Sequence, residues 1–174
     1  MAYISTKNEE EKVISVQSEE QWQRRDLELA NWLRRVKRRR RAKQTVLLGN
    51  IEVDAEMFGT LACLKRMNIQ TEFSCAGVSP LDEPEDHSLY AYITMFSSEK
   101  TDRFVQFAMG RMRHRLLVTF EPSRNRYDLS SFFIGHNRSF CLLLQRCAET
   151  FARLEQERTA EKLTIKYGLG KHTD

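Results

Sequence analysis

The sequence contains few of the residues that interrupt regular structure or cross-link chains. Its 174 residues include seven Gly, three Pro and four Cys, and Cys63, Cys75, Cys141 and Cys147 form no CxxC pair. No apolar stretch follows Met1 and no run of 18 apolar residues occurs, so neither a signal peptide nor a membrane span is predicted. We expect a cytoplasmic protein with reduced thiols, because nothing indicates a disulfide framework.

Positive charge is concentrated in one short segment. Residues 34–43 read RRVKRRRRAK, whereas the other 164 residues hold 20 basic and 24 acidic groups and are net negative. Such a run attracts polyanions by releasing their condensed counterions, so nucleic acid is the first partner to consider. A solvated helix end or a contact with an anionic membrane would have the same composition. The residues predicted to bind phosphates are Arg34, Arg35, Lys37, Arg38, Arg39, Arg40, Arg41 and Lys43.

A second, looser basic group could extend this surface if the fold places it near the first. Its members surround turns in the C-terminal half of the chain: Arg111, Arg113, Arg115, Arg124, Arg126 and Arg138. Phe73, Tyr90 and Tyr92 lie on predicted strands and could stack on unpaired bases, although aromatic strand residues are more often part of a core. RNA or a single strand is favoured over duplex DNA, because no helix-turn-helix or zinc-finger signature is present.

Hydrophobic periodicity predicts an α+β domain with tails. We expect an N-terminal arm over residues 1–17 with an edge strand near Val13, a basic amphipathic helix over 18–43, an α+β core over 44–163 and a flexible tail over 164–174. Ser18 with Gln21 has the pattern of a helix cap, Asp54 is expected to cap the next helix, and Asn137 or Ser139 is expected to cap the last one.

The core pattern alternates strands and helices. It predicts a mixed sheet of about five strands built from two β-α-β-β-like units, with a long C-terminal helix. The predicted strands cover 45–53, 69–75, 88–96, 115–121 and 127–135, and the predicted helices cover 55–67, 99–113 and 138–162.

The strand end TEFSCAG is the segment best suited to ligand chemistry. Gly77 can adopt positive φ and turn the chain sharply, which would expose Ser74, Cys75 and the following amides. His87 would approach Cys75 if the flanking strands pair as a hairpin. A buried core Cys followed by a turn Gly explains the string equally well. Two ligands are too few for a structural zinc site, so no metal and no catalytic residue are predicted.

Thr71, Ser74, Cys75 and Gly77 fit a Thr-x-x-Ser-Cys-x-Gly strand end. This string resembles that of the wybutosine-pathway tRNA methyltransferases, which have a duplicated β-α-β-β fold and a Ser-Cys-Ser-Gly-Arg hallmark, and that of small bacterial and phage proteins. The resemblance implies S-adenosylmethionine as cofactor and tRNA as substrate. Ala76 and Val78 replace the second Ser and the Arg of that hallmark, which removes two polar groups suited to ligand binding.

Three hypotheses follow from these patterns. The first is a nonenzymatic, regulatory nucleic-acid-binding protein that uses the basic helix and needs no cofactor. The second is an S-adenosylmethionine-dependent tRNA-modifying enzyme that uses the Ser74 to Gly77 turn. The third is a bacterial or phage adaptor in which the helix with Trp22 and Trp32 holds a protein partner or a second copy of the chain.

Overall fold

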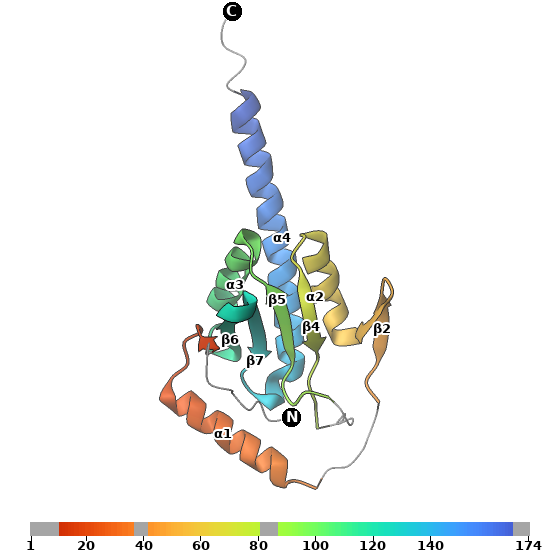
Figure 1. The fold of residues 1–174 in the computed structure, drawn as a ribbon, viewed down its shortest axis with the longest axis vertical. Helices are drawn as coiled ribbons and strands as arrows, with labels where there is room; N and C mark the ends of the chain where they lie inside the picture. The colour runs from red at the N-terminus through yellow and green to blue at the C-terminus, as the bar shows by residue number, and fades with distance from the viewer. Residues whose placement is uncertain (1–10, 37–41, 81–86, 169–174) are drawn as a thin grey trace, which may run out of the picture.

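The computed structural model describes residues 11–36, 42–80 and 87–168, and for residues 166–168 it describes the backbone alone. Its elements alternate largely as the periodicity predicts (Figure 1). The helices are α1 (Glu19–Arg34), α2 (Ala55–Arg66), α3 (Glu99–Met112) and α4 (Asn137–Gly168), with 3-10 turns η1 (Arg113–Arg115), η2 (Pro122–Arg124) and η3 (Ile134–His136). The strands are β1 (Lys12–Val13), β2 (Thr45–Leu48), β3 (Ile51–Asp54), β4 (Thr71–Cys75), β5 (Tyr92–Phe96), β6 (Leu116–Glu121) and β7 (Arg126–Ser131).

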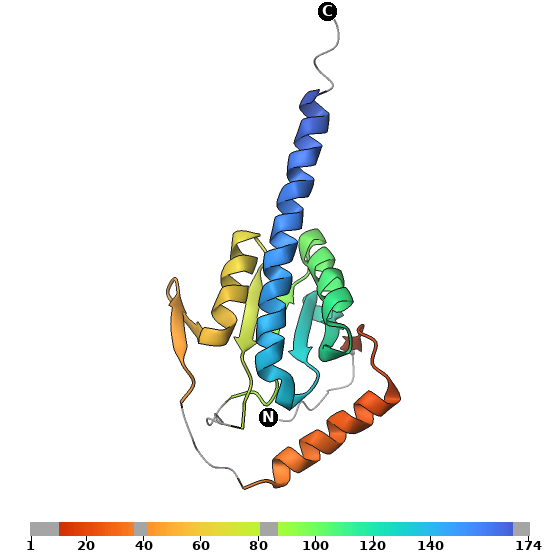
Figure 2. The same cartoon turned by 180° about the vertical axis from the view of Figure 1, so that it is seen from behind.

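A five-stranded sheet in the order β1-β6-β7-β5-β4 forms the centre of the molecule, and its pairings are antiparallel. Helices α2, α3 and α4 cover one face of this sheet, with α4 running between the other two (Figure 2). The order β3-α2-β4-β5 followed by α3-β6-β7 follows the predicted succession of elements, but β3 pairs with β2 outside the five-stranded sheet, whose fifth strand is β1. The predicted α+β class is therefore confirmed.

The main core lies between the sheet and these three helices. Successive strand residues point to opposite faces, so Ile93 and Met95 of β5 and Leu129 of β7 face the helices and are fully buried. Helical side chains of α2, α3 and α4 fill the other side, and Phe104 packs edge-to-face on Phe151 with ring centroids 5.5 Å apart. Full burial of such a side chain contributes about 1.5–3 kcal/mol, so this layer holds the strand ends in place.

The predicted strand over 45–53 is a β-hairpin. Strands β2 and β3 pair antiparallel as a separate two-stranded sheet, with Leu48 opposite Ile51. Gly49 takes φ +67° at the turn between them, a conformation that glycine adopts without steric cost. The prediction was wrong because the apolar run looks continuous, although Gly49-Asn50 is a recognised hairpin turn pair.

The basic helix is shorter than predicted. Ser18 forms the expected capping box with Gln21, but α1 ends at Arg34, and Arg35 is extended at φ −70° and ψ 151°. Like charges three and four residues apart repel each other on a helix, and Val36 is 87% exposed, so its burial does not stabilise a further turn. Residues 37–41 lie outside the described residues, and 42–44 form no helix.

Both predicted tails contain structure. In the N-terminal arm, β1 pairs with β6 as the expected edge strand, and the Ile14 amide donates to the Val118 carbonyl at 2.9 Å. At the other end, α4 continues to Gly168, beyond the predicted helix end at 162, and its C-terminal part extends away from the sheet (Figures 1 and 2). Within the part of the chain that the structure describes, no helix combines the length and apolar character needed to cross a membrane.

The sheet face that α2, α3 and α4 leave uncovered is polar. Thr94, Asp128 and Thr119 lie side by side across β5, β7 and β6. The pKa of Asp128 is raised to about 7, mainly by desolvation and also by the nearby carboxylates of Glu11 and Glu121, against the opposing effect of Arg126. Asp128 therefore holds a proton in the folded state at mildly acidic pH.

Asp128 predicts a pH dependence of stability. From about pH 4 to pH 7 the folded chain keeps a proton that the unfolded chain has released, so the free energy of unfolding falls as pH rises. Asp128→Asn should remove this slope and stabilise the protein above pH 7 by on the order of 1–3 kcal/mol. Urea unfolding from pH 4 to 8 measures the free energy of unfolding of each variant. Asp26→Asn, on the exposed face of α1, is the control and should keep the wild-type slope. Equal slopes in wild type and Asp128→Asn would contradict the assignment.

Candidate functional site at the end of the sheet

The turn after β4 forms the base of the candidate site. Gly77 adopts φ +72°, as predicted, and a side chain there would meet the backbone nitrogen of Ala91 and the amide of Asn137, each 2.4 Å from the added carbon. Cys75 and Ala76 are buried before the turn, and Val78 is buried after it. Only glycine fits this position, so the chain reverses directly behind the Cys75 thiol.

Asn137, the first residue of α4, fixes this turn. Its side-chain nitrogen donates to the carbonyls of Val78 and Leu89, and its oxygen accepts from the Ala91 amide, all at 2.8 Å. The residue is 2% exposed. Three backbone groups from two separate segments are thus satisfied by one amide. The sequence pattern suggests Asn137 only as a helix cap, so this role was missed.

Four polar side chains converge beside the turn. The Lys43 Nζ lies 3.1 Å from Asp54 Oδ2 and 3.7 Å from Cys75 Sγ, and the Cys75 Sγ lies 3.5 Å from His87 Nδ1. The side chains of Lys43 and Asp54 are 7% and 9% exposed. We call these residues the Lys43–Asp54–Cys75–His87 cluster. His87 lies beside Cys75 in this cluster, as the sequence predicts for a hairpin of the flanking strands.

Asp54 occupies the helix-capping position of α2 without making a side-chain cap bond. Its carboxylate instead accepts from the Ala76 amide at 2.6 Å and pairs with Lys43. The Gly77 amide, in turn, donates to Cys75 Sγ at 3.4 Å. The prediction that Asp54 caps α2 was therefore wrong. Asp54 instead adds a carboxylate to the thiol of Cys75 and the imidazole of His87, and sequence reasoning did not identify it. Ligand atoms of Asp54, Cys75 and His87 all lie within 4.8 Å of one another.

The rest of the predicted ligand turn lies away from this cluster. Thr71 begins β4, opposite Met95, at the far end of the strand from Cys75. Ser74 is half-buried opposite Ile93, and strand geometry directs it to the face opposite Cys75. The structure thus brings together Cys75, Gly77 and His87 from the predicted set and separates Thr71 and Ser74 from them.

A second thiol lies behind the cluster but differs from Cys75 in environment. Burial raises the pKa of Cys141 to about 12, and the Glu56, Asp54 and Cys75 charges add to this effect while Lys43 opposes it. Cys141 is therefore a protonated, buried thiol at neutral pH, whereas Cys75 contacts two nitrogen-bearing side chains.

Helix α1 lies across the same end of the sheet and docks by polar contacts (Figures 1 and 2). The Glu28 carboxylate accepts from the Ile134 and Gly135 amides at 2.7 and 2.9 Å, and Arg25 donates to the Ser131 and Phe132 carbonyls. Trp22 packs edge-to-face on Phe132 with centroids 4.9 Å apart. These contacts fix the direction of the helix.

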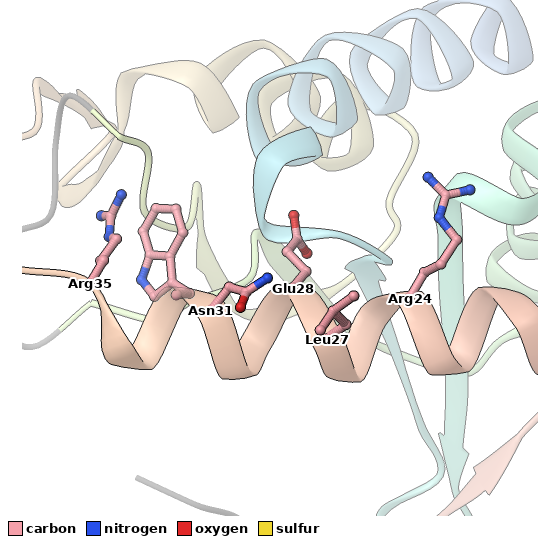
Figure 3. A pocket seen from close by; sticks show the side chains of 6 residues that line it. Arg24, Leu27, Glu28, Asn31 and Arg35 are labelled. Atoms are coloured by element: carbon pink, nitrogen blue, oxygen red, sulfur yellow. The ribbon is translucent and has the colours of Figure 1, made fainter.

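An open hollow runs along α1, and arginines stand at its two ends (Figure 3). Arg24, Glu28 and Arg35 extend from the same side of the helix. Arg24 stacks over the Phe133 ring at 5.5 Å, and Arg35 lies 3.3 Å from the centre of the Trp32 ring. The hollow is lined by Arg24, Leu27, Glu28, Asn31, Trp32 and Arg35.

Basic groups from three elements meet where α1 passes η1 and η3. Burial lowers the pKa of His136, and Arg115, His114 and Arg24 lower it further against the opposing effect of Glu28. Arg24, His114 and Arg115 are exposed. We call these four groups the sheet-end basic surface.

The basic residues predicted from sequence have different positions in the structure. Arg34 is exposed, Arg35 is half-buried, and Lys43 is turned into the cluster. Lys37, Arg38, Arg39, Arg40 and Arg41 lie outside the described residues. Of the looser group, Arg115 joins the sheet-end basic surface. Arg126 instead pairs with Glu72 and Glu121 at 2.5 and 2.6 Å, at the opposite end of β7.

Asn137→Ala tests whether the turn is held by the side-chain amide. The substitution leaves the Val78 carbonyl and the Ala91 amide without the partner that Asn137 supplies, while the Leu89 carbonyl keeps its bond from the Val78 amide at 3.4 Å. We therefore expect the free energy of unfolding to fall by about 2 kcal/mol or more. Urea denaturation measures the change. Ser139→Ala, which removes one exposed hydroxyl bond to the His136 carbonyl, is the control and should cost less than about 1 kcal/mol. A similar small cost for both variants would contradict the role of Asn137.

Comparison of the chain with protein-family models, curated proteins and solved structures finds no match. The resemblance to wybutosine-pathway methyltransferases therefore stays a prediction carried by four residues.

Proposed function

We propose that the protein binds nucleic acid, with RNA or a single strand preferred, through the arginine-rich residues 34–41 together with the sheet-end basic surface; Lys43, predicted with them, is instead paired with Asp54. The observation that carries the proposal is that Arg24, on the helix that leads into the basic run, stacks over Phe133 next to η3, and that Arg24, His114 and Arg115 all act on the pKa of His136 in η3. Two basic groups far apart in sequence thus share one end of the molecule.

The docking of α1 supports the proposal because it fixes cations before a ligand arrives. Glu28 and Arg25 hold the helix to η3 and β7 through backbone groups. Arg24 and Arg35 are restrained by stacking on Phe133 and Trp32. A cation that is already ordered loses less conformational entropy when it contacts a phosphate, so the surface is preorganised.

The distribution of charge supports the same conclusion. Outside residues 34–43 the chain has more acids than bases, so attraction for a polyanion has to come from local concentrations of basic residues, of which this run is the densest. Phe73 on the edge strand β4 is 53% exposed and offers a ring on which an unpaired base can stack. Tyr90 is less available, because the Arg25 guanidinium lies 3.8 Å from its ring centre.

The other two hypotheses become outcomes of the same test. Methyl transfer to tRNA predicts tRNA binding that depends on the Cys75 turn and increases with S-adenosylmethionine. A protein adaptor predicts no nucleic-acid binding at any salt concentration.

Fluorescence polarisation with labelled tRNA, single-stranded RNA and duplex DNA across a salt series tests the proposal. We expect the affinity of the wild-type protein for nucleic acid to fall steeply as salt concentration rises. Charge reversal of Arg38 to Arg41 should strongly reduce the slope of log affinity against log salt concentration. The double variant Arg24→Glu, Arg115→Glu should reduce the slope by about 1–2, since each lost phosphate contact with a single strand removes about 0.7.

The matched control is Arg146→Glu, Arg153→Glu, which reverses two exposed charges on α4. It changes the net charge as much as Arg24→Glu, Arg115→Glu does, and the salt dependence of its affinity should stay closer to that of the wild type. Equal losses in the two double variants would show that net charge, and not the sheet-end basic surface, determines binding. No binding at low salt would overturn the proposal.

A further inference from the structure

We propose that Asp54, Cys75 and His87 form a binding site for one divalent transition-metal ion, for which Zn²⁺ is the best-fitting biological ion, and that the metal takes the place of the Lys43 ammonium. The inference is independent of nucleic-acid binding, since it concerns the Lys43–Asp54–Cys75–His87 cluster alone.

The ligand types favour zinc. Thiolate, imidazole and carboxylate are the three side-chain donors that zinc sites use, whereas a purely oxygen set would favour Mg²⁺ or Ca²⁺. The set contains one of each. Three protein ligands leave a fourth tetrahedral position for water or a substrate, as in zinc sites that act on bound molecules.

The distances fit with a small adjustment. Metal–ligand bonds of about 2.0–2.3 Å in a tetrahedron place neighbouring ligand atoms about 3.3–3.8 Å apart. The Cys75 Sγ to His87 Nδ1 distance of 3.5 Å already lies in this range. All three ligand atoms lie within 4.8 Å of one another. Side-chain rotations that move these atoms by about 1 Å would therefore bring them to the separations of a tetrahedral site.

Backbone amides support two of the ligands. The Ala76 amide donates to Asp54 Oδ2 at 2.6 Å, and the Gly77 amide donates to Cys75 Sγ at 3.4 Å. Such outer hydrogen bonds orient metal ligands and hold their negative charge. Both amides belong to the turn that Asn137 holds in place, so the ligand positions are set by the fold.

Lys43 marks the position of positive charge in the site. Its ammonium contacts Asp54 at 3.1 Å and Cys75 at 3.7 Å, with 7% of the side chain exposed. A metal ion bound to the same atoms would be repelled by this charge over a few ångströms in a poorly hydrated environment. Lys43 therefore competes with the metal, and its removal should strengthen metal binding.

The test is titration of the full-length protein with Co²⁺, a spectroscopic substitute for Zn²⁺. We expect one Co²⁺ per chain, a near-ultraviolet thiolate-to-cobalt charge-transfer band, and loss of that band when Zn²⁺ is added. Cys75→Ser should remove the band. Asp54→Asn and His87→Gln should weaken Co²⁺ affinity at least tenfold, and Lys43→Met should strengthen it at least tenfold.

Matched controls are Cys147→Ser, a buried thiol outside the cluster, and His136→Gln, which lies on η3. Both should bind Co²⁺ like wild type, with folding checked by circular dichroism. If Cys75→Ser does not fold, the Co²⁺ affinities of the other variants test the proposal. Lys43→Met should then bind Co²⁺ more tightly than wild type, and Asp54→Asn more weakly. Absence of the band in both wild type and Lys43→Met, a band that survives in Cys75→Ser, or unchanged affinity in Lys43→Met would overturn the proposal. No readout involves nucleic acid, so this result is separable from that of the proposed function.

Discussion

The hydrogen bonds of the Asn137 side chain are the interactions on which the end of the sheet with the two candidate sites depends. This side chain joins the carbonyl of Val78, the carbonyl of Leu89 and the amide of Ala91 at the start of α4. Leaving such buried backbone groups unpaired costs about 1–3 kcal/mol each, a large share of the stability of a domain of this size. The turn it holds keeps Cys75 beside Asp54, and it keeps Val78 against Trp32 of α1. Both the buried cluster and the docked helix therefore rely on one amide.

The two proposed sites use opposite electrostatic conditions at the same end of the sheet. On the outside, Arg24 and Arg115 face water, where screening weakens repulsion and phosphates are accessible. Inside, Lys43 is desolvated and compensated by Asp54. A buried ammonium without such a partner would be strongly disfavoured, because desolvation penalises the charged form. The hairpin β2–β3 produces this pairing, because it brings Lys43 next to Asp54, which is eleven residues further along the chain.

The sequence predicted those features that depend on local periodicity or local chemistry. The amphipathic helices, the Ser18 cap and the positive φ of Gly77 follow from spacing of a few residues and are confirmed. Asn137 and Asp54 were assigned to helix caps, their commonest local role, because caps are the only partners that nearby sequence offers. Their actual partners are 11 to 59 residues away. No periodic pattern encodes a hydrogen bond across that separation, so the Asp54 ligand and the Asn137 anchor required the fold.

The basic run shows why residue type alone does not determine a charged residue's role. Its eight cations look equivalent in sequence, yet the described ones have three different environments: Arg34 is in solvent, Arg35 stacks on Trp32, and Lys43 pairs with Asp54. Stacking retains the positive charge of Arg35, because an aromatic ring does not neutralise a guanidinium. Pairing with a carboxylate neutralises the charge. Lys43 thus belongs to the buried cluster in energetic terms, and the phosphate-binding capacity of the segment is that of its arginine-rich part.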